Sequence, residues 1–386
     1  MEADGIEITS LCVGEPDYLP PPAVLESLIQ AVQAGQTRYT ALTGTLELRQ
    51  AISHDLQRRK GVMYDPKSEI LVGNGAKQCV FQGIYAVAGA GDQVLVPAPH
   101  WPYPEMVKLT SATPVIVETQ PEDGYLLTPK QLRQTLEEHS QIQLVIICNP
   151  SNPTGAVYSQ EQLAQLAEVL HDFPHVKVLA DEIYERLVYS DEADDDDDAR
   201  ANVFCFAALP GMWERTIIIN GFSKSHAMTG MRLGYLAAPA PLCKAATTIQ
   251  SQLTSCAGSL SQAAGVAALT KVHDSEIDQN VQIMKAKRDY VLQRLSHMQS
   301  LGLLTVNYAP RGAFYVLPDV SGICGDQDGD LCVDLLQSAR LALVPGSGFG
   351  APGTVRISYA TGMDVLVTAM DKLETYLTSK KQEKQQ

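Results

Sequence analysis

Between about residues 69 and 236, short runs of apolar and β-branched residues alternate with segments whose apolar residues recur at helical spacing. The clearest helical segment is Ser159–His171, which carries three leucines on one face. The apolar runs predict strands at Glu69–Val72, Gln93–Val96, Gln143–Cys148, Val176–Ala180 and Thr216–Asn220. This alternation predicts an α/β fold with a mainly parallel sheet flanked by helices on both faces.

The remainder of the chain predicts a second, smaller domain. Residues from about 241 to 300 have the pattern of a long helix, and Leu303–Val306 and Ala313–Leu317 have the pattern of strands. A chain of 386 residues is also too long for one small core and favours two or three domains.

Charge and hydropathy exclude several classes of protein. The net charge of −15 argues against non-specific binding of nucleic acid, which needs a basic surface. No apolar run reaches the roughly 18 residues that a membrane span requires. Part of the negative charge is the run Asp194–Asp198, which predicts an exposed surface loop. A calcium site is disfavoured there because the run lacks spaced ligands and a turn glycine.

Eight cysteines are scattered without C-x-x-C spacing, which favours free, buried thiols over disulfides or a metal site. The N-terminus carries neither a signal peptide nor a transit segment. We therefore expect a soluble protein of the cytoplasm, or of a plastid or other organelle stroma if a transit peptide has been removed.

Lys224 follows an apolar strand, in the segment Gly221-Phe-Ser-Lys-Ser225. Ser223 and Arg232 flank it, and hydroxyl groups and a guanidinium are suitable phosphate ligands. A lysine amine that is desolvated enough to lose its proton can form a Schiff base with an aldehyde. Taken alone, a lysine at this position is more typical of a solvated loop.

Asp181 ends a predicted strand in Leu179-Ala-Asp-Glu-Ile-Tyr184. A buried carboxylate is costly unless it has a cationic partner, and a protonated pyridine nitrogen would be one. At about 4 Å and an effective dielectric constant of roughly 20, that attraction is about 4 kcal/mol. An aspartate that caps the next helix is the alternative.

Two glycine-containing turns complete the set of motifs. In Cys148-Asn-Pro-Ser-Asn-Pro-Thr-Gly155, Asn152 can donate a hydrogen bond to a phenolic oxygen, although a tight turn would explain the segment too. In Val72-Gly-Asn-Gly-Ala-Lys77, backbone N–H groups at a helix start can bind phosphate, although taken alone the segment is more typical of a simple helix cap. The four motifs together, in this order, are far more specific than any one of them.

With these motifs, the chain resembles the class I aminotransferases, which are pyridoxal-phosphate (PLP) enzymes of fold type I. It looks most like the aspartate/prephenate aminotransferase branch of bacteria and plants. Further matching segments are Gly14-Glu-Pro-Asp17, Thr37-Arg-Tyr-Thr40 and Val355-Arg-Ile-Ser-Tyr-Ala-Thr361, so that the resemblance covers nearly the whole chain. It implies a homodimer whose subunits have a large PLP-binding domain (37–275) and a smaller α/β domain built from both chain ends (1–36 and 276–386).

The resemblance also implies a role for each site residue. Lys224 would bind PLP covalently and move the substrate proton, and Asp181 would keep the pyridine nitrogen protonated. Asn152 and Tyr184 would contact the phenolic oxygen, and Trp101 would stack on the ring. The phosphate would be held by Gly75, Ala76, Ser223 and Arg232, with Tyr39 reaching it from the neighbouring subunit.

The substrate would be read at two points. Arg356 would hold the α-carboxylate beside the Gly14 backbone, with Trp101 and Asn152 close by. Lys77, next to the cofactor, would meet the second carboxylate of aspartate, glutamate or prephenate. The expected reaction is a ping-pong transfer of an amino group between aspartate or glutamate and 2-oxo acids.

Two features depart from the family pattern. Met231 stands where relatives carry Trp, which we expect to alter packing rather than chemistry. Relatives also have an additional helical segment before the Gly14 motif, so we expect either a trimmed chain or a different closure of the site.

Several alternatives stay open at this point. An aminotransferase for aromatic or neutral amino acids, or a PLP-dependent lyase or decarboxylase, would share the fold. A PLP-binding regulator would need a DNA-binding domain, of which the sequence shows no sign. A nicotinamide dehydrogenase is disfavoured because no G-x-G-x-x-G follows the first strand.

Overall fold

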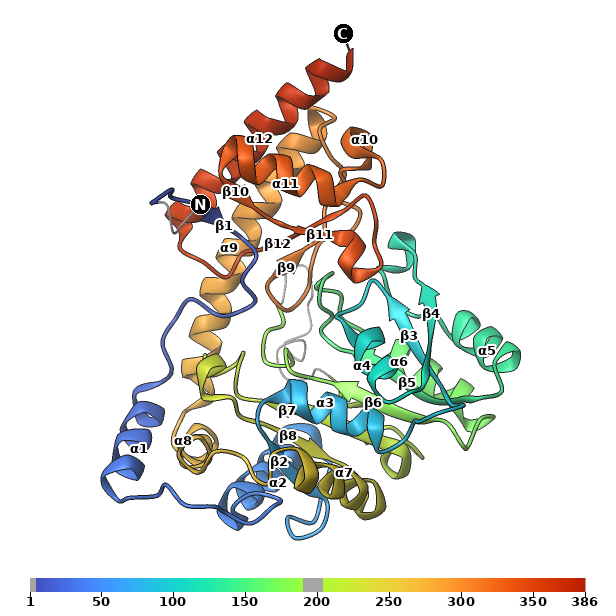
Figure 1. Cartoon of the computed structure of the whole chain (residues 1–386), viewed down its shortest axis with the longest axis vertical. Coiled ribbons are helices and arrows are strands. Elements are labelled where there is room, and N and C mark those ends of the chain that lie inside the picture. The colour runs from blue at the N-terminus through green and yellow to red at the C-terminus, as the bar shows by residue number, and fades with distance from the viewer. Residues whose placement is uncertain (1–4, 190–203, 386) are drawn as a thin grey trace.

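The computed structural model describes residues 5–189 and 204–385, and its centre is a seven-stranded sheet (Figure 1). The strand order is β2-β8-β7-β6-β5-β3-β4. Neighbours from β7 to β4 run parallel, whereas β8 is antiparallel to both β2 and β7. The strands are β2 (Ile70–Gly73), β3 (Gln93–Ala98), β4 (Thr113–Glu118), β5 (Ile142–Cys148), β6 (Lys177–Asp181), β7 (Thr216–Gly221) and β8 (Gly234–Ala237).

The predicted α/β class with a mainly parallel sheet is therefore confirmed, and the five predicted strands correspond to β2, β3, β5, β6 and β7. The pattern did not predict β4 or β8. Strand β4 alternates between partly buried and exposed residues, and β8 is only four residues long with no β-branched residue. The acidic run Asp194–Asp198 lies outside the described residues.

Alternate residues of the central strands face opposite layers of helices. In β5, Leu144 and Ile146 pack with α3, α4 and α7, whereas Val145 and Ile147 pack with α5 and α6. A strand buried on both faces needs apolar residues at every position, which explains the continuous apolar runs. These helices are α3 (Ala76–Tyr85), α4 (Tyr103–Leu109), α5 (Pro129–Glu138), α6 (Gln160–His171) and α7 (Ala240–Leu253).

The segment predicted as one long helix is three helices. They are α7, α8 (Ser259–Thr270) and α9 (Asp274–Ser300), with breaks at 254–258 and 271–273. Helix α8 packs with α2 (Leu46–Lys60) over β2, β7 and β8. The apolar positions of the segment continue through the breaks, so periodicity alone does not reveal where the helices end.

A second hydrophobic core lies beyond the sheet and contains residues from 281 to 377 (Figure 1). Its elements include a small antiparallel sheet of order β11-β12-β9 and the helices α9, α11 and α12. Predicted strand Ala313–Leu317 is reduced to β9 (Tyr315–Val316), and Leu303–Val306 forms only one isolated bridge, from Thr305 to Asp319. The other elements are α10 (Ser321–Cys324), α11 (Asp328–Ala339), β10 (Leu341–Ala342), β11 (Val344–Pro345), β12 (Val355–Ser358) and α12 (Met363–Gln385).

The N-terminal segment belongs to both parts of the molecule. Strand β1 (Thr9–Ser10) pairs in parallel with β10, next to the second core. Helix α1 (Pro22–Gln33), in contrast, packs against α8 beside the large sheet, where the Ser27 hydroxyl donates to the carbonyl oxygen of Ala263 at 3.0 Å. Among the described residues, no helix combines the length and the apolar character needed to cross a membrane.

Candidate active site

A pocket of about 440 Å³ lies at the carboxyl ends of the parallel strands, between the large sheet and the second core. Ligands of open α/β sheets bind at this edge because the strand ends and the following loops leave a crevice there. Eleven of the thirteen predicted site residues line the pocket: Gly14, Ala76, Lys77, Trp101, Asn152, Asp181, Tyr184, Ser223, Lys224, Arg232 and Arg356.

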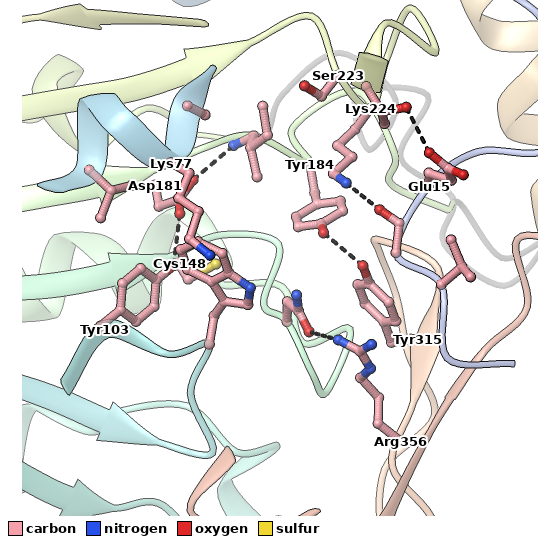
Figure 2. A pocket seen from close by; sticks show the side chains of 18 of the residues that line it. Glu15, Lys77, Tyr103, Cys148, Asp181, Tyr184, Ser223, Lys224, Tyr315 and Arg356 are labelled. Atoms are coloured by element: carbon pink, nitrogen blue, oxygen red, sulfur yellow. Dashed lines mark hydrogen bonds between the residues drawn. The ribbon is translucent and has the colours of Figure 1, made fainter. Parts of the chain in front are cut away.

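Lys224 enters the pocket from the loop after β7 (Figure 2). Its Nζ donates a hydrogen bond to the carbonyl oxygen of Gly14 and lies 5.7 Å from the ring centroid of Tyr184. Burial lowers the pKa of Lys224 to about 8, and the positive charges of Arg232 and Arg356 act in the same direction. The amine is therefore much more often uncharged near neutral pH than an ordinary lysine, as a nucleophile or base requires.

Asp181 is the last residue of β6 and is only 5% exposed. Its Oδ2 accepts a hydrogen bond of 2.8 Å from the Tyr103 hydroxyl, and its Oδ1 accepts one of 3.3 Å from the Ile183 N–H. Burial raises the pKa of this carboxyl to about 6. Asp181 forms no ion pair with any described residue, so the pocket offers a buried anion for a cationic group of a ligand.

The start of α3 is suited, in contrast, to bind an anionic group of the ligand. Gly75 caps the helix with φ +90°, and a Cβ at this position would lie 2.6 Å from Nη2 of Arg232. The Ser223 side chain and the N–H groups at the start of α3 border the same space. A guanidinium, a hydroxyl and a helix N-terminus suit a phosphate group.

Arg356 projects from β12 toward the opposite side of the pocket (Figure 2). Its Nη1 donates to Oδ1 of Asn152 at 3.1 Å, and its Nη2 donates to the carbonyl oxygen of Cys12 at 2.8 Å. Its Nε is buried and has no hydrogen-bond partner among the described residues. The guanidinium lies 4.5 Å from the ring centroid of Tyr315. A fixed guanidinium with spare donors suits the bidentate binding of a carboxylate.

Lys77 and Trp101 lie together on a third side of the pocket. The Lys77 ammonium lies 5.0 Å from the centroid of the Trp101 ring. Trp101 in turn makes an edge-to-face contact with Tyr103, with centroids 5.5 Å apart. Lys77 is exposed and forms no salt bridge with any residue that the structure describes, so its charge is available to a ligand.

Tyr184 occupies the middle of the pocket, where its hydroxyl lies 2.9 Å from the hydroxyl of Tyr315 (Figure 2). The turn that carries it is anchored from behind by Lys60, which is buried between the carboxylates of Glu182 and Glu185. Arg59 adds a 2.6 Å ion pair to Glu185. These contacts fix the segment that presents both Asp181 and Tyr184.

Two predicted residues do not line the pocket. Gly75 lies just behind Arg232, as described above. Tyr39 is 89% exposed, and its predicted contact with the phosphate would be made in the site of a second subunit. Eight lining residues were not predicted: Val13, Glu15, Val80, Tyr103, Cys148, Ile183, Thr229 and Tyr315. Of those with a charged or hydroxyl group, Glu15 had a signal because it follows Gly14 in a matching segment, and Tyr103 had one because it stands two residues after Trp101 at the start of a helix.

The residues present fit pyridoxal phosphate. The phosphate would lie at the start of α3, the ring nitrogen would face the otherwise unpaired Asp181, and the aldehyde would meet the Lys224 amine. Asn152 and Tyr184 line the same pocket, and each could donate a hydrogen bond to the phenolic oxygen. The phosphate and the protonated ring nitrogen of the ligand thus each have a partner of opposite charge in the pocket, Arg232 and Asp181 respectively.

Comparison with known proteins gives a consistent result. The family model for aminotransferase class I and II matches residues 6–370. A bifunctional aspartate aminotransferase and glutamate/aspartate-prephenate aminotransferase of Petunia hybrida is 43% identical over 97% of this chain and 78% of its own length.

Two solved structures have nearly the same backbone. The aspartate aminotransferase of Rhizobium meliloti is 35% identical, with a TM-score of 0.88 over 98% of this chain and 93% of its own. An aromatic aminotransferase of Pyrococcus horikoshii is also 35% identical, with a TM-score of 0.89 over 98% of both chains. The backbone is therefore shared by enzymes with different substrates, and side chains must decide the specificity.

Proposed function

The chain belongs to the class I and II aminotransferase family, and we propose that it moves the amino group between aspartate or glutamate and 2-oxo acids, namely oxaloacetate, 2-oxoglutarate and prephenate. The observation that carries this proposal is the presence of two cations, Arg356 and Lys77, on different sides of one pocket. A dicarboxylic substrate presents two negative charges, whereas an aromatic or neutral amino acid presents one.

Members of this family depend on pyridoxal phosphate, which supplies an electron sink that stabilises negative charge at the substrate Cα. We propose that Gly75, Ala76, Ser223 and Arg232 hold its phosphate. The helix start that follows Gly75 and the guanidinium beside Gly75 support this assignment. Trp101 would cover one face of the ring.

Asp181 and Tyr184 would set the electronic state of the cofactor. A buried, ionised carboxylate next to the ring nitrogen keeps that nitrogen protonated, because separating the two charges in this environment is costly. The hydroxyl of Tyr184 and the side-chain amide of Asn152 can donate hydrogen bonds to the phenolic oxygen. All three residues are buried, so water does not compete for these contacts.

Lys224 would act as the base and then as the acid. With a pKa lowered to about 8, its amine could accept a proton from the substrate Cα near neutral pH. It would then return the proton to the former aldehyde carbon of the cofactor. The Gly14 carbonyl, to which Nζ donates, positions the amine on the side of Arg356 and Gly14, where the substrate α-carboxylate would bind. The Gly14 carbonyl would thus hold the amine in place for proton transfer.

A homodimer is the assembly that best explains Tyr39. Its ring is almost fully exposed and lies outside the pocket, although the motif that carries it would place it at the cofactor phosphate. We propose that each subunit lends Tyr39 to the site of its partner. If so, mixing the inactive variants Tyr39→Ala and Lys224→Ala would restore activity, because one site of each mixed dimer would carry neither substitution.

We propose that the molecule has two domains, with the chain ends forming the smaller one. The second hydrophobic core, most of whose residues come from 281 to 377, supports this division. Since α1 packs on α8, we assign residues 22–36 to the large domain and keep residues 1–21 and 276–386 in the small one. Domain-boundary mobility can be measured by hydrogen exchange with and without a dicarboxylate.

The half-reaction tests the proposed specificity. The purified, PLP-loaded protein is mixed with aspartate, glutamate, alanine or phenylalanine, and the loss of the cofactor absorbance is followed; the amino form is then mixed with prephenate. We expect aspartate, glutamate and prephenate to react fastest. Faster reaction with alanine or phenylalanine would retain the aminotransferase assignment but contradict the dicarboxylic specificity. Release of ammonia or carbon dioxide without amino transfer would indicate a lyase or decarboxylase.

A further inference from the structure

Tyr103 is a buried tyrosine at the first position of α4, and its hydroxyl points at the carboxylate that ends β6 (Figure 2). The donor distance is 2.8 Å, whereas the second hydrogen bond to Asp181, from the Ile183 N–H, is longer at 3.3 Å. Tyr103 therefore supplies the shorter of the two hydrogen bonds to this carboxylate.

Tyr103 also touches the residue expected above the cofactor ring. Trp101 packs edge-to-face on Tyr103, with the ring planes inclined by 72°. Tyr103 thus contacts both Trp101, which would cover the ring face, and Asp181, which would bind the ring nitrogen. Tyr103 is 2% exposed, so its hydroxyl has no access to bulk water as an alternative partner.

We propose that Tyr103 is a positioning residue that governs how the proton between Asp181 and the cofactor ring nitrogen is shared. This inference rests on the proposed function, in which Asp181 faces that nitrogen. A hydrogen bond donated to a carboxylate stabilises its ionised form and lowers its affinity for a proton. With Tyr103 donating, the shared proton stays on the ring nitrogen; without it, the proton moves toward Asp181.

Other titratable groups around Asp181 do not replace this donor. Cys79 of α3 and Cys148 of β5 are neutral thiols, because burial raises the pKa of each to about 12. Glu182, next in the chain, is paired with Lys60 and adds negative charge, which raises the pKa of Asp181. Lys224 lowers it through its positive charge, but it makes no hydrogen bond to the carboxylate.

The test is nitrogen NMR of the protein loaded with pyridoxal phosphate that carries ¹⁵N in its ring. The ¹⁵N shift distinguishes a protonated from an unprotonated ring nitrogen independently of turnover. We expect Tyr103→Phe to move the signal toward the unprotonated form and to lower kcat about tenfold or more, with little change in KM. Loss of one hydrogen bond to a charged group corresponds to about one to two pKa units of Asp181.

Tyr158→Phe is the matched control, because the Tyr158 hydroxyl is also buried and accepts a backbone hydrogen bond, from Leu127 N–H at 2.8 Å. It should leave the ¹⁵N shift unchanged. A variant with 3,5-difluorotyrosine at position 103 provides the opposite change, since its more acidic hydroxyl is a stronger donor. It should shift the signal toward the protonated form even if Tyr103→Phe fails to fold.

An unchanged ¹⁵N shift in PLP-loaded Tyr103→Phe, or an equal change in Tyr158→Phe, overturns the inference and leaves the proposed function intact. An unaltered protein that binds no pyridoxal phosphate would instead refute the proposed function, and the inference with it.

Discussion

Arg356 and Asn152 are 204 positions apart in the chain, yet Nη1 of the arginine donates a 3.1 Å hydrogen bond to Oδ1 of the asparagine. Arg356 comes from β12 beside the second core, and Asn152 comes from the turn after β5 of the large sheet. This contact connects the proposed carboxylate-binding residue with a residue proposed to contact the cofactor. Substrate binding at Arg356 can thus change the hydrogen bonding of Asn152.

Replacing Arg356 by lysine should impair every amino-acid substrate. Lysine retains the charge but cannot make two parallel hydrogen bonds to a carboxylate. We expect kcat/KM to fall about 100-fold or more for aspartate, glutamate and alanine alike. Steady-state kinetics with the three amino acids measures this, and a loss confined to the dicarboxylic substrates would contradict the role of Arg356.

Replacing Lys77 by alanine should impair only the dicarboxylic substrates. The lost attraction acts on the second carboxylate, so kcat/KM for aspartate should fall about tenfold or more, while that for alanine stays within about twofold. Lys67→Ala, which removes another exposed lysine away from the pocket, serves as the control. Equal losses for aspartate and alanine would refute the assignment of Lys77 as the specificity residue.

The covalent capture of pyridoxal phosphate should depend on pH with a midpoint near 8. Only the uncharged amine reacts, and at pH 7.5 roughly a quarter of Lys224 is uncharged if its pKa is about 8. The capture rate of the cofactor-free protein, followed by absorbance in stopped flow, should rise through this midpoint and then level off. Lys224→Ala should give no covalent absorbance at any pH. A midpoint near 10, as for a solvated lysine, would contradict the effect of burial.

Asp181→Asn should stabilise the cofactor-free protein at high pH. The folded-state pKa of Asp181, about 6, lies above the ordinary value of 3.8, so its favourable neutral form persists only at low pH. The stability that the neutral carboxyl contributes to the folded protein is fully present below about pH 4 and is lost as the pH rises through 6. At 1.4 kcal/mol per pKa unit, the charge then costs about 3 kcal/mol, which an uncharged asparagine avoids.

Denaturant unfolding of the two proteins at several pH values measures this difference. The gain in the free energy of unfolding for Asp181→Asn should grow by about 2–3 kcal/mol between pH 4 and pH 8. A gain that does not depend on pH would mean that the substitution acts through packing instead.

Gly75→Ala should weaken cofactor binding by displacing Arg232. The added methyl group would lie 2.6 Å from Nη2 of Arg232, and the backbone at φ +90° is unfavourable for alanine. Gly91→Ala separates the two effects, since Gly91 has φ +92° and nothing within 4 Å of the added carbon. We expect both variants to lose about 1–2 kcal/mol of stability but only Gly75→Ala to raise the Kd for pyridoxal phosphate, about tenfold or more. Equal affinities of Gly75→Ala and Gly91→Ala for pyridoxal phosphate, measured by fluorescence titration, would show that Gly75 and Arg232 do not bind the phosphate.

The sequence by itself determined the sheet class and most of the chemistry. Continuous apolar runs predicted five central strands because a strand covered on both faces must be apolar throughout. Lys224, Asp181 and Asn152 follow such strands, and the carboxyl ends of parallel strands share one edge of a sheet. Order along the chain was therefore enough to predict that these residues meet.

Only the tertiary structure decided the remaining features. Strand β8 pairs antiparallel with both β2 and β7, and the helices around α8 end although the apolar pattern continues through the breaks. Long-range contacts rather than local preference stabilise the strand pairing and the helix ends. The partners of the Tyr103 and Tyr315 hydroxyls could not be predicted from the sequence. The packing of α4 and β9 brings these hydroxyls within 2.8 Å of Asp181 and 2.9 Å of Tyr184 respectively. A side chain acquires such a role from burial and a fixed partner, and both arise only when distant segments have folded together.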